Sequence, residues 1–171
     1  MSTKYLGQEF DIHGGGMDLL FPHHESEIAQ STICNHANPV CYWIHNNMIT
    51  IDGRKMGKSY NNQIRLTEMF SGDHPLLEKA WHPMVIRFFI LQTQYRSTLD
   101  FSNEALGAAE KGLRRLWDAY EKSLVLSRES LVGSVDAELD SKIKKLIAEL
   151  DEFMNDDFNT AKVLGSMFEL V

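Results

Sequence analysis

The first third of the chain is organised around the segment from His13 to Glu27, HGGGMDLLFPHHESE. It overlaps residues 10–16, FDIHGGG, which are typical of a short apolar strand that enters a glycine-rich turn. After Pro22 we expect a helix over residues 23–37, entered through the proline. Residues 41–51, CYWIHNNMITI, are rich in aromatic and β-branched side chains and predict strand, turn and strand. Strand, glycine turn, helix and strand in this order indicate an α/β layer.

From Pro83 onward the apolar residues recur at helical spacing. The expected helices are Met84–Tyr95, one capped by Ser102 that reaches Leu124, one over Leu139–Phe153, and one that starts at Asn159 or Thr160. A linker is expected at residues 129–135. The predicted fold class is therefore α/β passing into all-α, with helix predominant.

Length and composition narrow the class of protein. The 171 residues suit one medium domain or two small ones, and no segment approaches the ~20 apolar residues of a membrane span. The two cysteines, Cys34 and Cys41, are too few for a disulfide framework, so a reducing cytoplasm is the expected compartment. Both are expected to be small buried hydrophobic residues. A net charge of −7 argues against a bulk polyanion binder but allows a local basic patch.

One such patch lies in the loop that contains KMGKS. Between Arg54 and Arg65 there are basic residues and no acidic ones, which suggests an anionic ligand, although charge alone favours a solvated loop. The segment resembles a phosphate-binding P-loop, but its glycines enclose too few residues, and the sequence that follows is poor helix-opening material. Lys55 and Lys58, three residues apart, can instead hold successive oxygens of a polyphosphate as point charges.

The FPHHESE segment offers possible metal ligands. His23 and Glu27 are spaced i, i+4, so on a helix they share one face and can offer a nitrogen and an oxygen to one zinc ion. His24 and Glu25 are expected to point elsewhere. A surface hydrogen bond is the commoner explanation of such a pair. Neither cysteine obviously completes the site: Cys34 is ~16 Å further along a continuous helix, and Cys41 could return only by a specific fold.

The HGGGMD segment admits two interpretations. Its glycines let the backbone approach a ligand closely, and the carboxylate of Asp18 can accept hydrogen bonds from ribose hydroxyls. Alternatively, the segment is a tight turn in which Asp18 caps a helix. The residues alone do not separate the two.

Three motifs in fixed order, HGGGMDLLFPHHESEIAQS, YWIHNNMI and DGRKMGKS, resemble the second half of the catalytic domain of cysteinyl-tRNA synthetase, a class I aminoacyl-tRNA synthetase. RFFILQTQYRSTLDFS resembles the connecting region of that family, and DDFNTAKVL a motif in its helical domain. The resemblance implies the C-terminal half of a Rossmann-type nucleotide-binding domain with parallel strands at 1–52, the signature loop and a connecting helical region at 53–101, and the start of a helical bundle on the anticodon side at 102–171.

The resemblance also implies roles in binding and activating ATP. KMGKS is a variant of the family's KMSKS loop, in which Lys58 would neutralise charge on the phosphates and Lys55 would assist. Gly16 and Asp18 would hold the adenosine ribose, with Mg²⁺ as the counter-ion of ATP. This is electrostatic catalysis of in-line displacement at the α-phosphorus.

On the amino-acid side, His23 and Glu27 match two of the family's four zinc ligands, and His13 matches a histidine lining the amino-acid pocket. Zinc would bind the substrate thiolate and so make the site selective for cysteine over serine. The implied enzyme is a cysteine–tRNA ligase with ATP, L-cysteine and tRNA(Cys) as partners, monomeric, cytoplasmic and not bound to a membrane.

The chain departs from the family pattern in three respects. The other two zinc ligands of the family are cysteines that would lie before Met1, the His-Ile-Gly-His motif is absent, and Gly57 stands where serine is usual. The glycine is expected to make the loop more mobile without removing its charges. We therefore expect a piece of a longer protein that is inactive alone.

Two other functions remain as alternatives. The first is a non-catalytic tRNA- or protein-binding module with a vestigial signature loop. Its candidate contacts are Lys111, Arg114, Arg115, Lys142, Lys144 and Lys145, which would otherwise be ordinary solvated residues. The second is a zinc hydrolase, which the lack of an HExxH motif disfavours.

Overall fold

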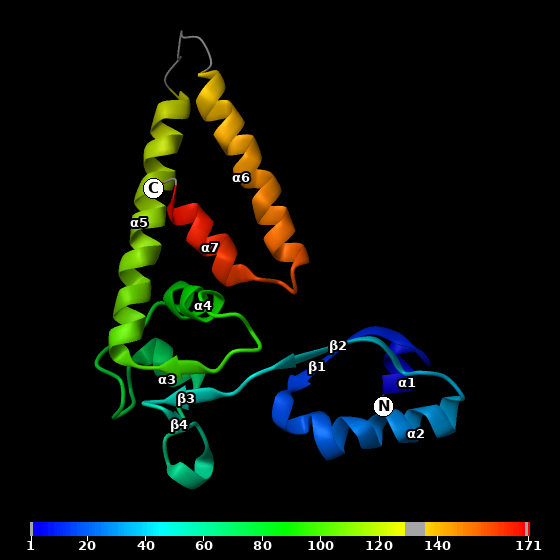
Figure 1. The fold of residues 1–171 in the computed structure, drawn as a ribbon. Coiled ribbons are helices and arrows are strands. Elements are labelled where there is room, and N and C mark those ends of the chain that lie inside the picture. Colours follow the sequence, from blue (N-terminus) through cyan, green and yellow to red (C-terminus); the bar gives the residue numbers. More distant parts are fainter. Residues whose placement is uncertain (1, 129–135, 170) are drawn as a thin grey trace. The chain divides into compact units, whose positions relative to one another are not determined.

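The computed structural model describes residues 2–128, 136–169 and 171 (Figure 1). The chain forms two compact units. Unit 1 comprises Met1–Met56 and Tyr95–Asp100, and unit 2 comprises Gly57–Gln94 and Phe101–Val171. Unit 1 is therefore discontinuous in sequence. The division at 1–52, 53–101 and 102–171 stays a prediction.

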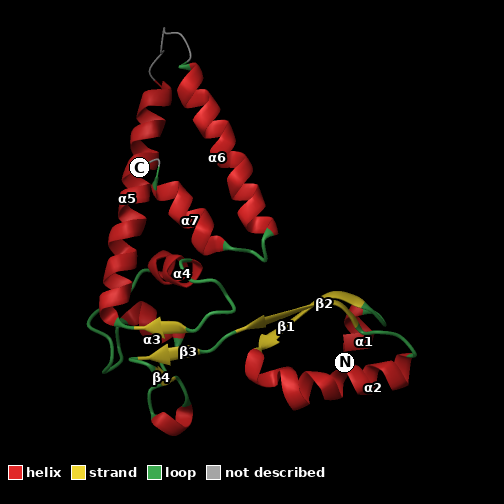
Figure 2. Cartoon of the chain, viewed as in Figure 1, coloured by secondary structure: helices red, strands yellow, loops and turns green. Residues whose placement is uncertain are grey.

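Unit 1 contains a parallel pair of strands joined by a helical crossover (Figure 2). Strands β1 (Phe10–Gly16) and β2 (Val40–Asn46) are parallel, and α2 (Glu25–Asn35) connects them. The other elements of this part are α1 (Ser2–Leu6), the 3₁₀ turn η1 (Met17–Leu19) and the π-type turn η2 (Leu20–His24). The predicted α/β arrangement with parallel strands is confirmed, and the helix begins two residues later than expected because η2 occupies the entry.

A second, three-stranded sheet has the order β4-β3-β5. Its strands are β3 (Ile49–Ile51), β4 (Arg54–Lys55) and β5 (Leu99–Phe101). Ile51 pairs with Arg54, so β3 and β4 form a hairpin with a two-residue turn. The turn residues Asp52 and Gly53 have φ values of 50° and 74°. Positive φ at both positions is the pattern of a type I′ turn, for which Asp-Gly is a preferred sequence.

One carboxylate ties this hairpin to β5. Asp100 Oδ1 accepts a hydrogen bond of 2.5 Å from the Thr50 hydroxyl and one of 2.8 Å from the backbone N–H of Gly53. These two bonds, the Thr50 bond first, lower the pKa of Asp100 below its ordinary value. The ionised carboxylate thus holds the turn that precedes the KMGKS loop.

Unit 2 is helical. Its elements are the 3₁₀ turn η3 (Lys58–Tyr60) and helices α3 (Leu66–Ser71), α4 (Pro83–Leu91), α5 (Asn103–Arg128), α6 (Ala137–Asn155) and α7 (Thr160–Phe168). Ser102 Oγ accepts from the backbone N–H of Ala105 at 3.1 Å, and Asn159 Oδ1 from that of Lys162 at 3.2 Å. These contacts confirm the expected cap at Ser102 and the expected helix start at Asn159 or Thr160. The expected linker at 129–135 lies outside the described residues.

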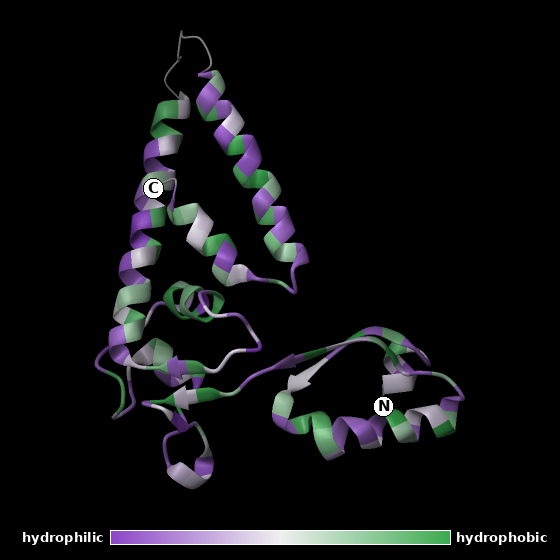
Figure 3. Cartoon of the chain, viewed as in Figure 1, coloured by the Kyte–Doolittle hydropathy of each residue, from purple (hydrophilic) through white to green (hydrophobic). Residues whose placement is uncertain are grey.

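Helix α4 supplies much of the core of unit 2. Figure 3 shows it as hydrophobic along most of its length, whereas α6 alternates between hydrophobic and hydrophilic residues. Phe88 of α4 meets Phe168 of α7 edge-on, with ring centroids 6.4 Å apart, and Phe89 meets Phe101 in the same way at 6.3 Å. The change from α/β to all-α and the predominance of helix are confirmed. No helix among the described residues has the length and apolar character that crossing a membrane requires.

Candidate active site

The glycine-ended strand β1 places a histidine against a tryptophan of β2. The parallel register sets His13 beside Trp43 and Gly15 beside His45. The rings of His13 and Trp43 stack, with centroids 4.5 Å apart and planes at 22°. Trp43 and His45, two residues apart on one strand, project to the same face. We call His13, His23, His24, Trp43 and His45 the histidine cluster.

The centre of the histidine cluster is His24, which is 3% exposed. Its Nδ1 lies 2.9 Å from Nε2 of His45, so the two rings share a hydrogen bond. Its ring centroid is 4.9 Å from that of Trp43 and 5.2 Å from that of His13. Burial, and then the neighbouring His13 and His45, lower the pKa of His24. The neutral form of the ring is therefore favoured.

The glycine run makes room for this ring. A Cβ on Gly15 would lie 2.5 Å from Cε1 and 2.8 Å from Nε2 of His24, well inside ordinary contact distance. One on Gly14 would meet nothing closer than a carbonyl oxygen at 3.8 Å. Gly15 is therefore required by the buried imidazole, and Gly14 is not.

Glu27 joins the histidine cluster from α2. Its Oε1 lies 3.2 Å from Nε2 of His23, and its Oε2 lies 3.4 Å from Nε2 of His13. The expected closeness of His23 and Glu27 is confirmed, while their role as metal ligands stays a prediction. Oε2 is buried and no hydrogen-bond donor is aligned to it. A buried carboxylate oxygen without an aligned donor favours the binding of a cation beside it.

The expectation that His24 points away from this site is wrong. One ligand atom each of His13, His24 and Glu27 lies within 4.8 Å of the others, which is close enough for one metal ion. The expectation assumed regular α-helical spacing, but residues 20–24 form a π-type turn in which Phe21 has extended backbone angles. His24 itself has helical backbone angles, and its ring reaches the cluster because Gly15 leaves room for it beside β1.

The residues predicted to bind ATP lie at the end of β1 and in the β3–β4 hairpin. A Cβ on Gly16 would collide with Oδ1 of Asp18, so this glycine allows the carboxylate to fold back beside the strand end. Asp18 Oδ2 lies 3.6 Å from Nζ of Lys55. The structure thus brings a predicted ribose-binding carboxylate and a predicted phosphate-binding lysine together. Both side chains are exposed.

The second lysine of the signature loop, Lys58, opens the turn η3 in unit 2 and is exposed. No long helix follows it, because Asn61 takes a left-handed conformation, in agreement with the rejection of a P-loop. Gly57 has an extended backbone, and its N–H donates to Oδ1 of Asn62 at 2.9 Å. A Cβ at this position would make only ordinary contacts, the nearest at 3.8 Å, so the backbone also suits the serine usual in the family.

The expectation that both cysteines are buried is wrong, since Cys34 and Cys41 are exposed. Cys34 follows Ile33 on the outer face of α2, and Cys41 lies on the outer face of β2 with Sγ 3.6 Å from a carboxylate oxygen of Glu9. Partial burial, and then the charge of Glu9, raise the pKa of the Cys41 thiol. The two positions read as apolar in sequence but face outward in the described fold.

Sequence reasoning missed His45, Trp43 and Asp100. Trp43 and His45 stand at i and i+2 in a strand whose pairing with β1 was not known, so period-2 spacing was the one available signal. Asp100 lies far along the chain from the turn that it holds. Its spacing from Thr50 carries no local pattern that would indicate the contact.

Comparison with known proteins agrees with this geometry. Residues 1–111 match the family model described as the tRNA synthetases class I (C) catalytic domain, and residues 149–171 match the DALR domain. The fold is similar to that of LeuRS from Agrobacterium radiobacter K84 in a ternary LeuRS–tRNA–LeuAMS complex, with a TM-score of 0.65 and 17% identity over 94% of this chain and 22% of that one. The chain therefore belongs to the family of class I (C) tRNA synthetases.

Its curated relatives are named more narrowly. The chain is 56% identical over its whole length to the cysteine–tRNA ligase of Cytophaga hutchinsonii, covering 34% of that protein. It is 55% identical over 99% of its length to that of Bacteroides thetaiotaomicron, covering 33% of the relative. Against the cysteine–tRNA ligase of Deinococcus radiodurans the identity is 44%, over 99% of this chain and 32% of that one. The resemblance to cysteinyl-tRNA synthetase is confirmed, and the chain spans about a third of the length of these relatives.

Proposed function

We propose that this chain is part of a cysteine–tRNA ligase, which activates L-cysteine with ATP and transfers it to tRNA(Cys). The observation that supports this most is the juxtaposition, in unit 1, of two kinds of site. The histidine cluster with Glu27 offers metal and amino-acid contacts, and the Asp18–Lys55 pair offers nucleotide contacts. The protein acts as a monomer in the cytoplasm.

The nucleotide is held by the strand end and the signature loop. Asp18, given room by Gly16, accepts hydrogen bonds from the ribose hydroxyls. Lys55 and Lys58 neutralise negative charge on the phosphates, with Mg²⁺ as the counter-ion of ATP. A carboxylate oxygen of cysteine attacks the α-phosphorus and pyrophosphate leaves. Point charges suit this reaction because its catalysis depends on positioning and charge stabilisation.

The amino-acid side of the site fits a zinc ion. His23 and Glu27 would hold it, and the buried Glu27 oxygen without an aligned hydrogen-bond donor is the sign that a cation suits this place. When bound, zinc would supply a Lewis acid that coordinates the thiolate of the substrate cysteine. Serine has a hydroxyl group in place of that thiolate and would bind the metal less well. His13 lines the pocket with its ring fixed by stacking on Trp43. The lowered pKa of His24 favours its neutral form, and its hydrogen bond holds His45 in place.

The proposal is tested on the protein expressed from its complete reading frame. Purified protein should contain zinc and catalyse cysteine-dependent exchange of pyrophosphate into ATP. Glu27→Gln should lower the zinc content, measured by elemental analysis, together with exchange. Lys58→Gln should lower the exchange rate by about 10²–10³-fold with zinc content unchanged, because it removes one stabilising charge.

A non-catalytic tRNA- or protein-binding module gives the opposite result. Such a protein would bind RNA but show neither stoichiometric zinc nor exchange with cysteine. Exchange supported equally by serine would also contradict the proposal, because it would mean that no thiolate-selective contact is present.

A further inference from the structure

The β3–β4 hairpin, which carries Lys55, is too short to fix its own position. Strand β4 consists of Arg54 and Lys55 alone, and both residues are exposed. The register places Thr50 of β3 directly opposite Lys55. A two-stranded hairpin is at best marginally stable in water without a further strand or a helix packed on it. The position of Lys55 therefore depends on what holds β3 from its other side.

That other side is bonded to the return segment, residues 95–100, which belongs to the same unit. The backbone N–H and the side-chain amide of Asn47 donate to the carbonyls of Tyr95 and Arg96, each at 2.9 Å. These bonds tie the beginning of the segment to the chain just before β3. At the end of the segment, next to the hairpin turn, the tie is made by Asp100.

Asp100 holds the hairpin at two points with one oxygen. Its Oδ1 accepts a hydrogen bond of 2.5 Å from the Thr50 hydroxyl and one of 2.8 Å from the N–H of Gly53. Thr50 is buried, and because residues directly opposite in an antiparallel pair project to one face, its side chain lies on the same face as that of Lys55. Gly53 is the last residue of the turn before β4. The carboxylate thus fixes both the residue opposite Lys55 and the turn that leads to it.

On its far side Lys55 meets the end of β1. Its Nζ lies 3.6 Å from Oδ2 of Asp18, and the two side chains are 50% and 59% exposed. An ion pair with this exposure is weak and does not by itself fix a long, flexible side chain. The lysine is brought to Asp18 by the placement of its backbone in β4, and that placement depends on β3 and its partners.

We propose that Asp100 is a positioning residue for adenylate formation, which holds the hairpin so that Lys55 is aimed at the nucleotide beside Asp18. The proposal rests on the proposed function, which assigns the phosphates to Lys55. Asp100 acts through Thr50 and Gly53, and the lysine makes the contact with the phosphates. A displacement of about 1 Å in a group that stabilises a transition state can cost about 10²-fold in rate. Loss of the carboxylate therefore lowers the rate through Lys55.

The test is cysteine-dependent pyrophosphate exchange by the full-length protein, with kcat and with KM for ATP and for cysteine determined separately. Asp100→Ala should lower kcat by about 10–10²-fold, with KM for cysteine and the zinc content unchanged. Asp100→Asn should stay within about twofold of the wild type, because its amide oxygen can accept the same two hydrogen bonds. Thr50→Val removes one of the two bonds and should give an intermediate rate.

A double-mutant cycle separates positioning from a general loss of stability. In the Lys55→Gln background, Asp100→Ala should change kcat by less than about twofold, because the group that it positions is already gone. Residues that act independently would instead give the same factor in both backgrounds. The melting temperature of every variant is measured alongside, so that a loss of folded protein is not mistaken for a loss of rate.

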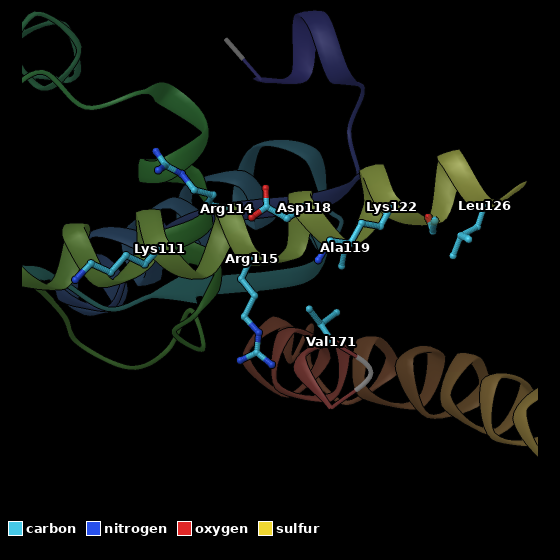
Figure 4. A pocket seen from close by; sticks show the side chains of 9 residues that line it. Lys111, Arg114, Arg115, Asp118, Ala119, Lys122, Leu126 and Val171 are labelled. Atoms are coloured by element: carbon cyan, nitrogen blue, oxygen red, sulfur yellow. The ribbon is translucent and has the colours of Figure 1, made fainter. Parts of the chain in front are cut away.

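Unit 2 offers two matched controls. Asn103 also holds the backbone with two bonds, since Oδ1 accepts from the N–H of Glu78 at 3.1 Å and Nδ2 donates to the carbonyl of Leu76 at 2.8 Å. Asn103→Ala should lower the melting temperature but not kcat. Lys122 is an exposed lysine that lines a hollow along α5 (Figure 4). Lys122→Gln removes one surface charge, as Lys55→Gln does, and should leave exchange unchanged.

The positioning role is overturned if Asp100→Ala costs the same factor with and without Lys55, or if Asn103→Ala lowers kcat as much. Failure of Asp100→Asn to restore the rate would also overturn it, since the charge rather than the two accepted bonds would then be what acts. If Asp100→Ala does not fold, Thr50→Val decides in the same cycle, and an unchanged kcat rejects the role. Absence of exchange in the wild type rejects the proposed function and the positioning role with it, whereas exchange in the wild type with any of these outcomes rejects the positioning role alone.

Discussion

Alanine at Gly15 should damage the histidine cluster, whereas alanine at Gly14 should not. Both glycines lie in β1, pair with β2 and lack a positive φ, so backbone strain does not distinguish them. At Gly15 the new Cβ would be 2.5 Å from Cε1 of His24, so the ring must move by about 1 Å to reach ordinary contact. At Gly14 the nearest atom is 3.8 Å away.

The expected difference follows from what the His24 ring contacts. Overpacking at a buried ring costs about 1–3 kcal/mol, and weakening of the His24–His45 hydrogen bond adds about 0.5–1.5 kcal/mol. Alanine at Gly14 should instead stabilise by about 0.4–1 kcal/mol, through the lower conformational entropy of the unfolded chain. The entropic gain applies to both variants and cancels, so they should differ by about 1.5–4.5 kcal/mol, with Gly15→Ala the less stable.

Hydrogen exchange measured by mass spectrometry on peptides from β1 and β2 reports this difference as local opening. Exchange in Gly15→Ala should be faster than in Gly14→Ala by at least about tenfold, since 1.4 kcal/mol corresponds to a factor of ten. Peptides from α4 and α5, in unit 2, serve as an internal reference and should not change. Equal protection of the two variants would show that the His24 ring is not held where the structure places it.

Three further outcomes are expected. Gly72→Ala should lower the melting temperature, because φ is +77° and the Cβ would be 2.5 Å from a backbone nitrogen, whereas Gly165→Ala, with open space around it, should raise it slightly. The pKa of Asp100 is lower in the folded protein, so as the pH falls the unfolded chain takes up a proton at this group first. Asp100 therefore stabilises the fold above about pH 4, and this stabilisation is lost as the pH falls through the folded pKa. Asp100→Asn should remove this pH dependence of the unfolding free energy, measured in urea at a series of pH values. Glu9→Gln should speed alkylation of Cys41 by iodoacetamide near neutral pH, since the charge of Glu9 helps to raise the pKa of that thiol; an unchanged rate would show that Glu9 does not act on it.

The local elements were predictable where the signal lay in consecutive residues. The strand ending in three glycines, the cap at Ser102, the helix start at Asn159 or Thr160 and the apolar helix after Pro83 all appear in the structure. Each depends on side chains within a few positions of one another, so propensity and capping chemistry were sufficient.

The site was predictable only in part, because much of it depends on contacts between distant segments. The closeness of His23 and Glu27 followed from their spacing, but the burial of His24 depends on Gly15 and on pairing with His45 across the sheet. Residue type also misled at Cys41, which is exposed in β2 together with the adjacent Tyr42. Tertiary pairing, rather than local pattern, decided these positions.

Strand β5 is synthesised well after β3 and β4, and this order affects folding during translation. Strands β3 and β4 leave the ribosome before residues 56–98, whereas Asp100, which holds their turn, leaves after them. Until then one edge of β3 has no partner, and unpaired strand edges promote association between nascent chains. A pause in translation before β5 should therefore raise aggregation and demand for chaperones, so the codons for residues 95–100 are positions where decoding speed would influence the yield of folded protein.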